Sequence, residues 1–161
     1  MFIELETIFN NVGSSKKIDF SFVPEDEELI SGAVDVSSTV ENRAGIVTYF
    51  GKADFVLSAE CDRCAESFNR AMTVDFEHVL VSELNDNDND EFVLVEGMKL
   101  DVDSLVREDI ILSLPTRLLC KEDCKGLCQI CGANLNKQQC GCKKPVDSRL
   151  AVLMQLLEDD N

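Results

Sequence analysis

Eight cysteines in four close pairs constrain this chain of 161 residues more than any other feature of its sequence. One to three residues separate the two members of each pair: Cys61 and Cys64, Cys120 and Cys124, Cys128 and Cys131, Cys140 and Cys142. Two cysteines at such a spacing can bind one zinc ion from a tight turn, and two such pairs complete a tetrahedral site. The spacing therefore predicts two four-thiolate structural zinc sites.

Four pairs can form two such sites in three ways. Local closure favours one site made of Cys128, Cys131, Cys140 and Cys142, because only eight residues separate the two pairs and a short loop is inexpensive to close. The upstream cysteines are then left to form the second site: Cys61, Cys64, Cys120 and Cys124. Gly132 follows Cys131 directly and favours a turn whose amide groups point toward the sulfurs.

Disulfide bonds are the competing interpretation of an even cysteine count. The first 22 residues contain Glu4, Glu6 and Asp19 and lack an unbroken apolar stretch, which argues against a signal peptide. No stretch of the sequence approaches the ~18 consecutive apolar residues of a membrane span. We therefore expect a soluble protein of the reducing cytoplasm, where cysteines bind metal more often than they form disulfides.

The charge is strongly acidic, with 31 acidic residues against 15 basic residues and a net charge of −16. Such a surface favours a basic protein partner and repels the phosphates of nucleic acids. The segment from Lys125 to Lys144 is the exception, because it contains no acidic residue. Its lysines are candidate partner-binding residues, and the alternative is that they only offset the thiolate charge: Lys125, Lys137, Lys143 and Lys144.

Hydrophobic periodicity predicts an α+β fold built on a mainly antiparallel sheet that can curl toward a barrel. Apolar residues alternate with polar ones over residues 30–40, 53–59 and 72–80, which indicates three strands, with Cys61–Cys64 in the turn between the last two. Helical spacing over 102–114, with Asp101 or Asp103 as a cap and Pro115 beyond it, predicts a helix of about three turns.

The remaining segments complete the expected organisation. Acidic runs at 25–28 and 85–91 are typical of solvated loops, and the second lacks the Gly and Glu that a calcium loop needs. Residues 147–157 carry a helical apolar pattern, so we expect a C-terminal helix. We expect residues 1–119 to hold the sheet and first helix, and residues 120–161 to hold the zinc segment and last helix, both packed as one unit.

The sequence offers little for catalysis. His78 is the only histidine, and its place on the apolar side of a strand favours a packed residue with a satisfied ring nitrogen over a base or ligand. A phosphate-binding glycine loop is absent from the sequence. The Cys61–Cys64 pair could act in redox chemistry, but the predicted hairpin differs from the strand-to-helix context of thioredoxin-like enzymes. We therefore predict a protein that is not an enzyme.

Several segments together resemble the bacterial YceD family of large ribosomal RNA subunit accumulation proteins. The similar segments are 61–64, 108–115, 120–136, 140–142 and 147–151. Two positions depart from the family pattern, because Gln129 and Ser148 stand where proline is usual, and neither change removes a cysteine. Some similar members keep the upstream pair and lack the complete C-terminal cluster. Membership implies support of large-subunit assembly and accumulation of 23S ribosomal RNA, and it supplies no chemical mechanism.

Three functional hypotheses fit these observations. In the first, the protein binds a basic ribosomal or ribosome-assembly protein, and zinc only stabilises the fold. In the second, the lysine-containing zinc segment contacts large-subunit ribosomal RNA directly. The third is a holdase that releases zinc when its thiols are oxidised. The acidic charge and the absence of an aromatic RNA-binding motif favour the first hypothesis.

Overall fold

The computed structural model describes residues 1–24, 28–83 and 92–142. These residues form two compact units. The first unit comprises Met1–Ala59 and Ser67–Leu118, and the second comprises Glu60–Glu66 and the chain from Leu119 onward. No helix in the described ranges is long and apolar enough to span a membrane. The packing of the C-terminal part on the rest of the chain as one unit stays a prediction.

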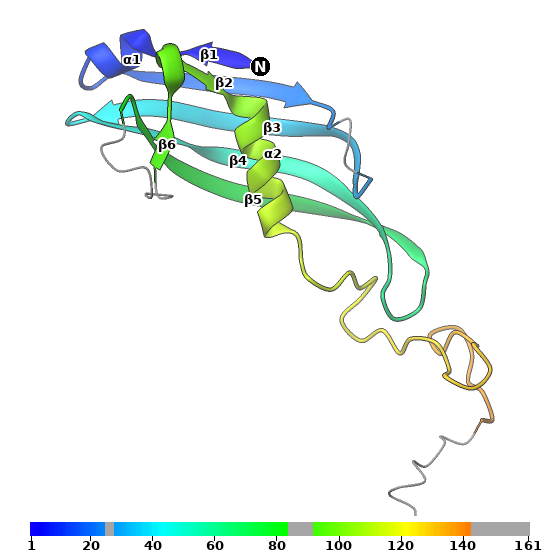
Figure 1. Cartoon of the computed structure of the whole chain (residues 1–161). Coiled ribbons are helices and arrows are strands. Elements are labelled where there is room, and N and C mark those ends of the chain that lie inside the picture. Colours follow the sequence, from blue (N-terminus) through cyan, green and yellow to red (C-terminus); the bar gives the residue numbers. More distant parts are fainter. Residues whose placement is uncertain (25–27, 84–91, 143–161) are drawn as a thin grey trace, which may run out of the picture. The chain divides into compact units, whose positions relative to one another are not determined.

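A five-stranded sheet dominates the first unit, and its strand order is β2-β3-β4-β5-β6 (Figure 1). The strands are β2 (Ser15–Phe22), β3 (Ile30–Arg43), β4 (Ile46–Glu60), β5 (Ser67–Val81) and β6 (Phe92–Leu94). β3 pairs antiparallel with β2 and with β4, whereas the short β6 runs parallel to β5. β2 and β6 do not pair with each other, so the described sheet is open and does not close into a barrel, and the expected curl toward a barrel is not confirmed.

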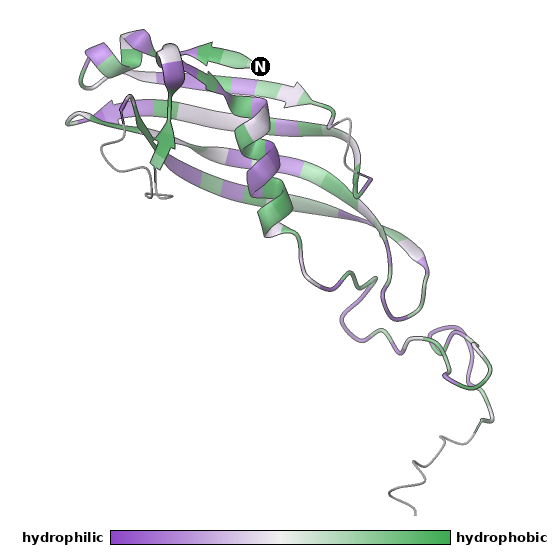
Figure 2. Ribbon diagram, viewed as in Figure 1, coloured by the Kyte–Doolittle hydropathy of each residue, from purple (hydrophilic) through white to green (hydrophobic). Residues whose placement is uncertain are grey.

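The alternation of apolar and polar residues explains why these segments are strands. In β3, Val34 and Val36 are buried while Asp35 and Ser37 are exposed, because successive side chains point to opposite faces of a sheet. β4 and β5 show the same alternation, which is visible as colour changes along the strands in Figure 2. The prediction of a mainly antiparallel sheet from this pattern is confirmed.

Several short helices and strands of the first unit were not predicted from the sequence. They are β1 (Phe2–Glu4), α1 (Glu6–Asn10), the 3-10 helix η1 (Glu96–Met98) and β7 (Lys99–Asp101), together with the three-residue β6. β1 and β7 pair antiparallel as a separate two-stranded sheet. Each of these elements spans five residues or fewer, which is too short to show a reliable hydrophobic period.

The helix α2 (Val102–Ser113) lies across one face of the five-stranded sheet (Figure 1). Val102, Val106 and Ile110 are fully buried in the same apolar core as the sheet, so the expected helix is confirmed. Asp101 takes the N-cap position, but its side chain makes no capping bond and instead accepts a hydrogen bond of 3.1 Å from the amino group of Met1.

His78 connects the sheet to this helix. Its Nε2 atom lies 2.8 Å from Oδ2 of Asp109 on α2, and both side chains are largely buried. The expectation of a packed histidine with a satisfied ring nitrogen is therefore confirmed. Three other expectations fall wholly or mostly outside the described part of the chain: the acidic runs at 25–28, of which only Glu28 is described, and at 85–91, and the C-terminal helix at 147–157.

Candidate metal centres

The eight cysteines of the second unit come together in two groups of four. The first group contains Cys61, Cys64, Cys120 and Cys124, and the second contains Cys128, Cys131, Cys140 and Cys142. Within each group every pair of sulfur atoms lies within 4.8 Å. The structure thus forms the same two sets of four that the closure argument favours.

The sulfur separations match those around a tetrahedral metal ion. Sγ of Cys61 lies 3.8 Å from Sγ of Cys124, and Sγ of Cys64 lies 3.7 Å from Sγ of Cys120. A zinc–sulfur bond of about 2.3 Å gives a tetrahedron with an edge of about 3.8 Å, whereas a disulfide bond needs about 2.05 Å. None of the eight described cysteines forms a disulfide bond. The geometry is therefore compatible with a zinc ion in each group.

A tight turn presents the first two sulfurs of the first group. The amide of Cys61 donates to the carbonyl oxygen of Glu66 (2.9 Å), and the amide of Ala65 donates to the carbonyl oxygen of Cys61 (2.8 Å). Ala65 has φ of 54°, in the left-handed region that favours glycine. We call residues 61–66 the first knuckle.

The second group contains the same turn, at residues 128–133, which we call the second knuckle. The amide of Cys128 donates to the carbonyl oxygen of Ala133 (2.8 Å), and the amide of Gly132 donates to the carbonyl oxygen of Cys128 (2.9 Å). Gly132 has φ of 71°, so it takes the left-handed position that Ala65 takes in the first knuckle. One backbone conformation thus recurs at both sites, with glycine in one copy and alanine in the other.

Both knuckles point amide groups at their leading sulfur. The amides of Cys120, Arg63 and Cys64 lower the pKa of the Cys61 thiol to about 6. The amides of Cys131 and Ile130 do the same for Cys128, whose pKa is also about 6. Hydrogen bonds to a thiolate favour the charged form, which is the form that binds metal. The turn therefore helps to prepare each leading cysteine as a ligand, and at Cys61 the amide of Cys120, outside the turn, contributes most.

In each group at least one thiol, Cys120 in the first and Cys142 in the second, resists ionisation when no cation is present. Burial, together with the neighbouring cysteines, raises the pKa of Cys120 to about 12. The thiol of Cys131 raises the pKa of Cys142 to about 12, with burial as the second cause. Four clustered thiols cannot all become anions without a positive charge among them, and a divalent ion supplies it. The donor set therefore fits zinc.

Asn136 joins the first group to the loop of the second. Its side-chain Nδ2 donates to Sγ of Cys124 (3.2 Å), and its Oδ1 accepts from the amide of Lys125 (2.9 Å). Asn134 holds it in place, because Oδ1 of Asn134 accepts from the Asn136 amide at 2.9 Å. Asn136 was not predicted as a site residue, and its place in the family-like segment 120–136 was the only available signal.

Gly126 allows the segment between the two groups to approach the first knuckle closely. A Cβ atom at Gly126 would lie 2.9 Å from the carbonyl oxygen of Arg63, and φ at Gly126 is 75°. The same carbonyl accepts a hydrogen bond of 3.0 Å from the amide of Leu127, and the Arg63 guanidinium donates to the carbonyl oxygen of Cys124 (2.9 Å). The segment between the two sites thus packs tightly against the first knuckle.

The two groups differ in exposure. Cys61, Cys64 and Cys124 are 2–3% exposed, whereas Cys131 is exposed and the other cysteines of the second group are partly buried. Four protein sulfurs fill a tetrahedral coordination shell and leave no position for substrate or water, as in structural zinc sites. The arrangement is suited to holding the fold together rather than to metal-assisted chemistry.

The candidate partner-binding lysines divide into three cases. Lys137 forms an ion pair with Glu66 of the first knuckle, which lowers the pKa of that carboxyl group and raises the pKa of the lysine. Lys125 is exposed. Lys143 and Lys144 lie outside the described residues. Lys137 therefore contributes to the structure of the second unit.

The fold and these clusters define a class: an α+β protein with a second unit organised by two four-cysteine groups. The model of the family "Large ribosomal RNA subunit accumulation protein YceD" matches residues 50–157, and the chain belongs to this family. The similarity implied by the sequence motifs is thus confirmed.

A curated relative is the "Large ribosomal RNA subunit accumulation protein YCED homolog 1, chloroplastic" of Arabidopsis thaliana. It is 38% identical over 47 residues, which cover 29% of this chain and 15% of the relative. The chain therefore matches only a small part of that longer protein. No solved structure matches this chain.

Proposed function

We propose that this protein is a non-enzymatic factor of the cytoplasm that supports assembly of the large ribosomal subunit and accumulation of 23S ribosomal RNA. Membership of the YceD family over residues 50–157 carries this proposal, because the family is named for large ribosomal RNA subunit accumulation. The two closed sulfur clusters support a structural role for metal and leave no coordination position for a substrate.

In this proposal two zinc ions fold the second unit, one in each group of four cysteines. The first group links the first knuckle to Cys120 and Cys124, and the second group closes residues 128–142, where no long helix or strand holds the chain together. A segment with so little secondary structure gains most from metal ligands, because metal binding then supplies its folding free energy.

The proposed partner is a basic ribosomal or ribosome-assembly protein rather than bare RNA. The net charge of −16 favours a cationic partner and opposes phosphate. The ion pair between Lys137 and Glu66 also supports this choice, because it partly neutralises one of the candidate partner-binding lysines.

Deletion of the gene in its own host tests the proposal. We expect the ratio of 23S to small-subunit ribosomal RNA to fall and large subunits to become scarce in sucrose gradients. The wild-type chain should restore both, and the Cys64→Ser and Cys131→Ser variants should restore them only partly. An unchanged RNA ratio and subunit profile in the deletion strain would refute the proposed function.

A further inference from the structure

The outward face of the five-stranded sheet carries exposed apolar side chains. α2 packs on the opposite face, and no described element covers this one. Strand β4 nevertheless places Ile46 (59% exposed), half-buried Phe50 and Val56 (36% exposed) at outward positions. Outward positions of a solvated sheet normally hold polar residues. Thr48, Lys52 and Asp54 lie between these apolar residues on the same side of the strand, so the face mixes apolar and charged groups, as a protein-binding surface does.

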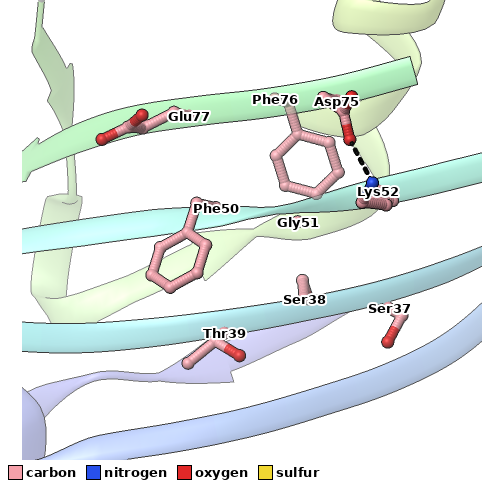
Figure 3. A pocket seen from close by; sticks show the side chains of 9 residues that line it. All are labelled: Ser37, Ser38, Thr39, Phe50, Gly51, Lys52, Asp75, Phe76 and Glu77. Atoms are coloured by element: carbon pink, nitrogen blue, oxygen red, sulfur yellow. Dashed lines mark ion pairs between the residues drawn. The ribbon is translucent and has the colours of Figure 1, made fainter.

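A shallow hollow of about 620 Å³ surrounds Phe50 and opens outward between β3, β4 and β5 (Figure 3). Thr39 borders it on β3, and Glu77 borders it on β5. Gly51 lies at its floor, where a Cβ atom would come within 2.5 Å of the carbonyl oxygen of Ser37. Only glycine permits this close approach of β3 and β4, so the hollow is a built feature of the sheet.

The charges around this hollow leave a surplus of carboxylates. Each outward lysine or arginine of β2, β3 and β4 is already paired with an acidic residue: Lys17 with Asp19, Arg43 with Glu41 and Lys52 with Asp75. Within the first unit, the other outward acidic residues of β3, β4 and β5 form no ion pair with a described residue: Asp35, Asp54 and Glu77. This part of the face therefore offers three negative charges to a partner, beside its apolar side chains.

We propose that this outward face docks an extended, basic segment of a protein partner. Apolar side chains of the segment contact Ile46, Phe50 and Val56, while its lysines or arginines approach the three surplus carboxylates. A cation can also lie over the ring of Phe50, which attracts positive charge. The inference rests on the proposed function, since it locates the surface that binds the basic partner. A phosphate backbone is disfavoured here, because the surplus charge repels it.

A defined peptide tests the surface directly. The probe is a fluorescein-labelled twelve-residue peptide in which lysine alternates with valine, and its binding to the full chain is followed by fluorescence anisotropy. The face variant combines Asp35→Asn, Asp54→Asn and Glu77→Gln. The control variant combines Glu4→Gln, Glu6→Gln and Glu96→Gln, which are exposed residues of β1, α1 and η1. Both variants change the net charge by the same amount.

We expect the face variant to weaken peptide binding about fivefold or more, and the control variant to weaken it less than about twofold. The Phe50→Ser variant should also weaken binding at high salt, where charge is screened and apolar contact remains. Thermal unfolding confirms that each variant is folded. Equal weakening by the two charge variants, or no weakening by either, would overturn the assigned surface.

Purified proteins of the large ribosomal subunit separate this inference from the proposed function. If a subunit protein binds the wild-type chain and loses affinity only with the face variant, the assigned surface is supported. If it binds both chains equally, the surface assignment fails and the proposed function stands. If no subunit protein binds the wild-type chain, the proposed partner class fails, and the peptide result alone decides the surface.

Discussion

The two knuckles contain the same left-handed position, so the effect of a side chain at that position on zinc affinity can be tested in both directions. Gly132→Ala should weaken zinc binding at the second group, and Ala65→Gly should strengthen it at the first. Both residues have positive φ, of 71° and 54°. A residue with a side chain loses about 1–2 kcal/mol of folding free energy when it adopts the left-handed conformation. Glycine avoids this cost, but its greater loss of backbone entropy on folding costs about 0.5–1 kcal/mol relative to alanine. The net effect is about 0.5–1 kcal/mol, or a two- to fivefold change in zinc affinity.

The structure makes the Gly132 variant a clean test, because a Cβ atom there would meet nothing within 4 Å. Its effect is therefore conformational and does not arise from a clash. Competition with a chromophoric chelator measures the two zinc affinities, and the unmodified group serves as the internal control in each variant. Weaker binding by Ala65→Gly, or equal loss at both groups from Gly132→Ala, would refute the reasoning.

Two further predictions concern other parts of the chain. Asn136→Ala should weaken zinc binding at the first group about tenfold or more, although Asn136 follows the second knuckle, because it removes the amide donor to Cys124. Asn136→Asp should also weaken zinc binding at the first group, although it keeps the oxygen that accepts from the Lys125 amide. Competition with a chelator measures the affinity, and an unchanged zinc affinity of the first group in both variants would contradict this role. Burial raises the pKa of Tyr49 to about 12 from 10.0, so stability present below pH 10 should be lost between pH 10 and 12. In urea unfolding, the free energy of unfolding of the wild type should fall by about 2–3 kcal/mol more than that of Tyr49→Phe over that pH range. Equal falls in the two proteins would show that the pKa of Tyr49 is not the cause.

The long strands and α2 could be predicted from the sequence because their periods extend over many residues. β2 also carries a usable signal, since Ile18, Phe20 and Phe22 face the core while the residues between them are exposed. This strand was nevertheless not predicted from the sequence. The parallel pairing of β6 was not predictable, because three residues cannot specify a strand direction.

Some features of the candidate metal centres could likewise be predicted from the sequence, and others could not. The grouping of the cysteines follows from loop closure, which depends only on their spacing along the chain. The role of Asn136 does not, because its contact with Cys124 depends on the path of the intervening backbone. The repeated turn was equally hidden, since alanine at position 65 gives no sign of positive φ. Local spacing is readable from sequence, and contacts that depend on the folded path are not.

The number of zinc ions bound by one chain tests the central claim most directly. Native mass spectrometry of the protein, purified under reducing conditions, should show two zinc ions per chain. Cys64→Ser should remove the ion of the first group, and Cys131→Ser should remove the ion of the second, each leaving one. A fully loaded wild-type chain with one zinc ion or none would contradict the account.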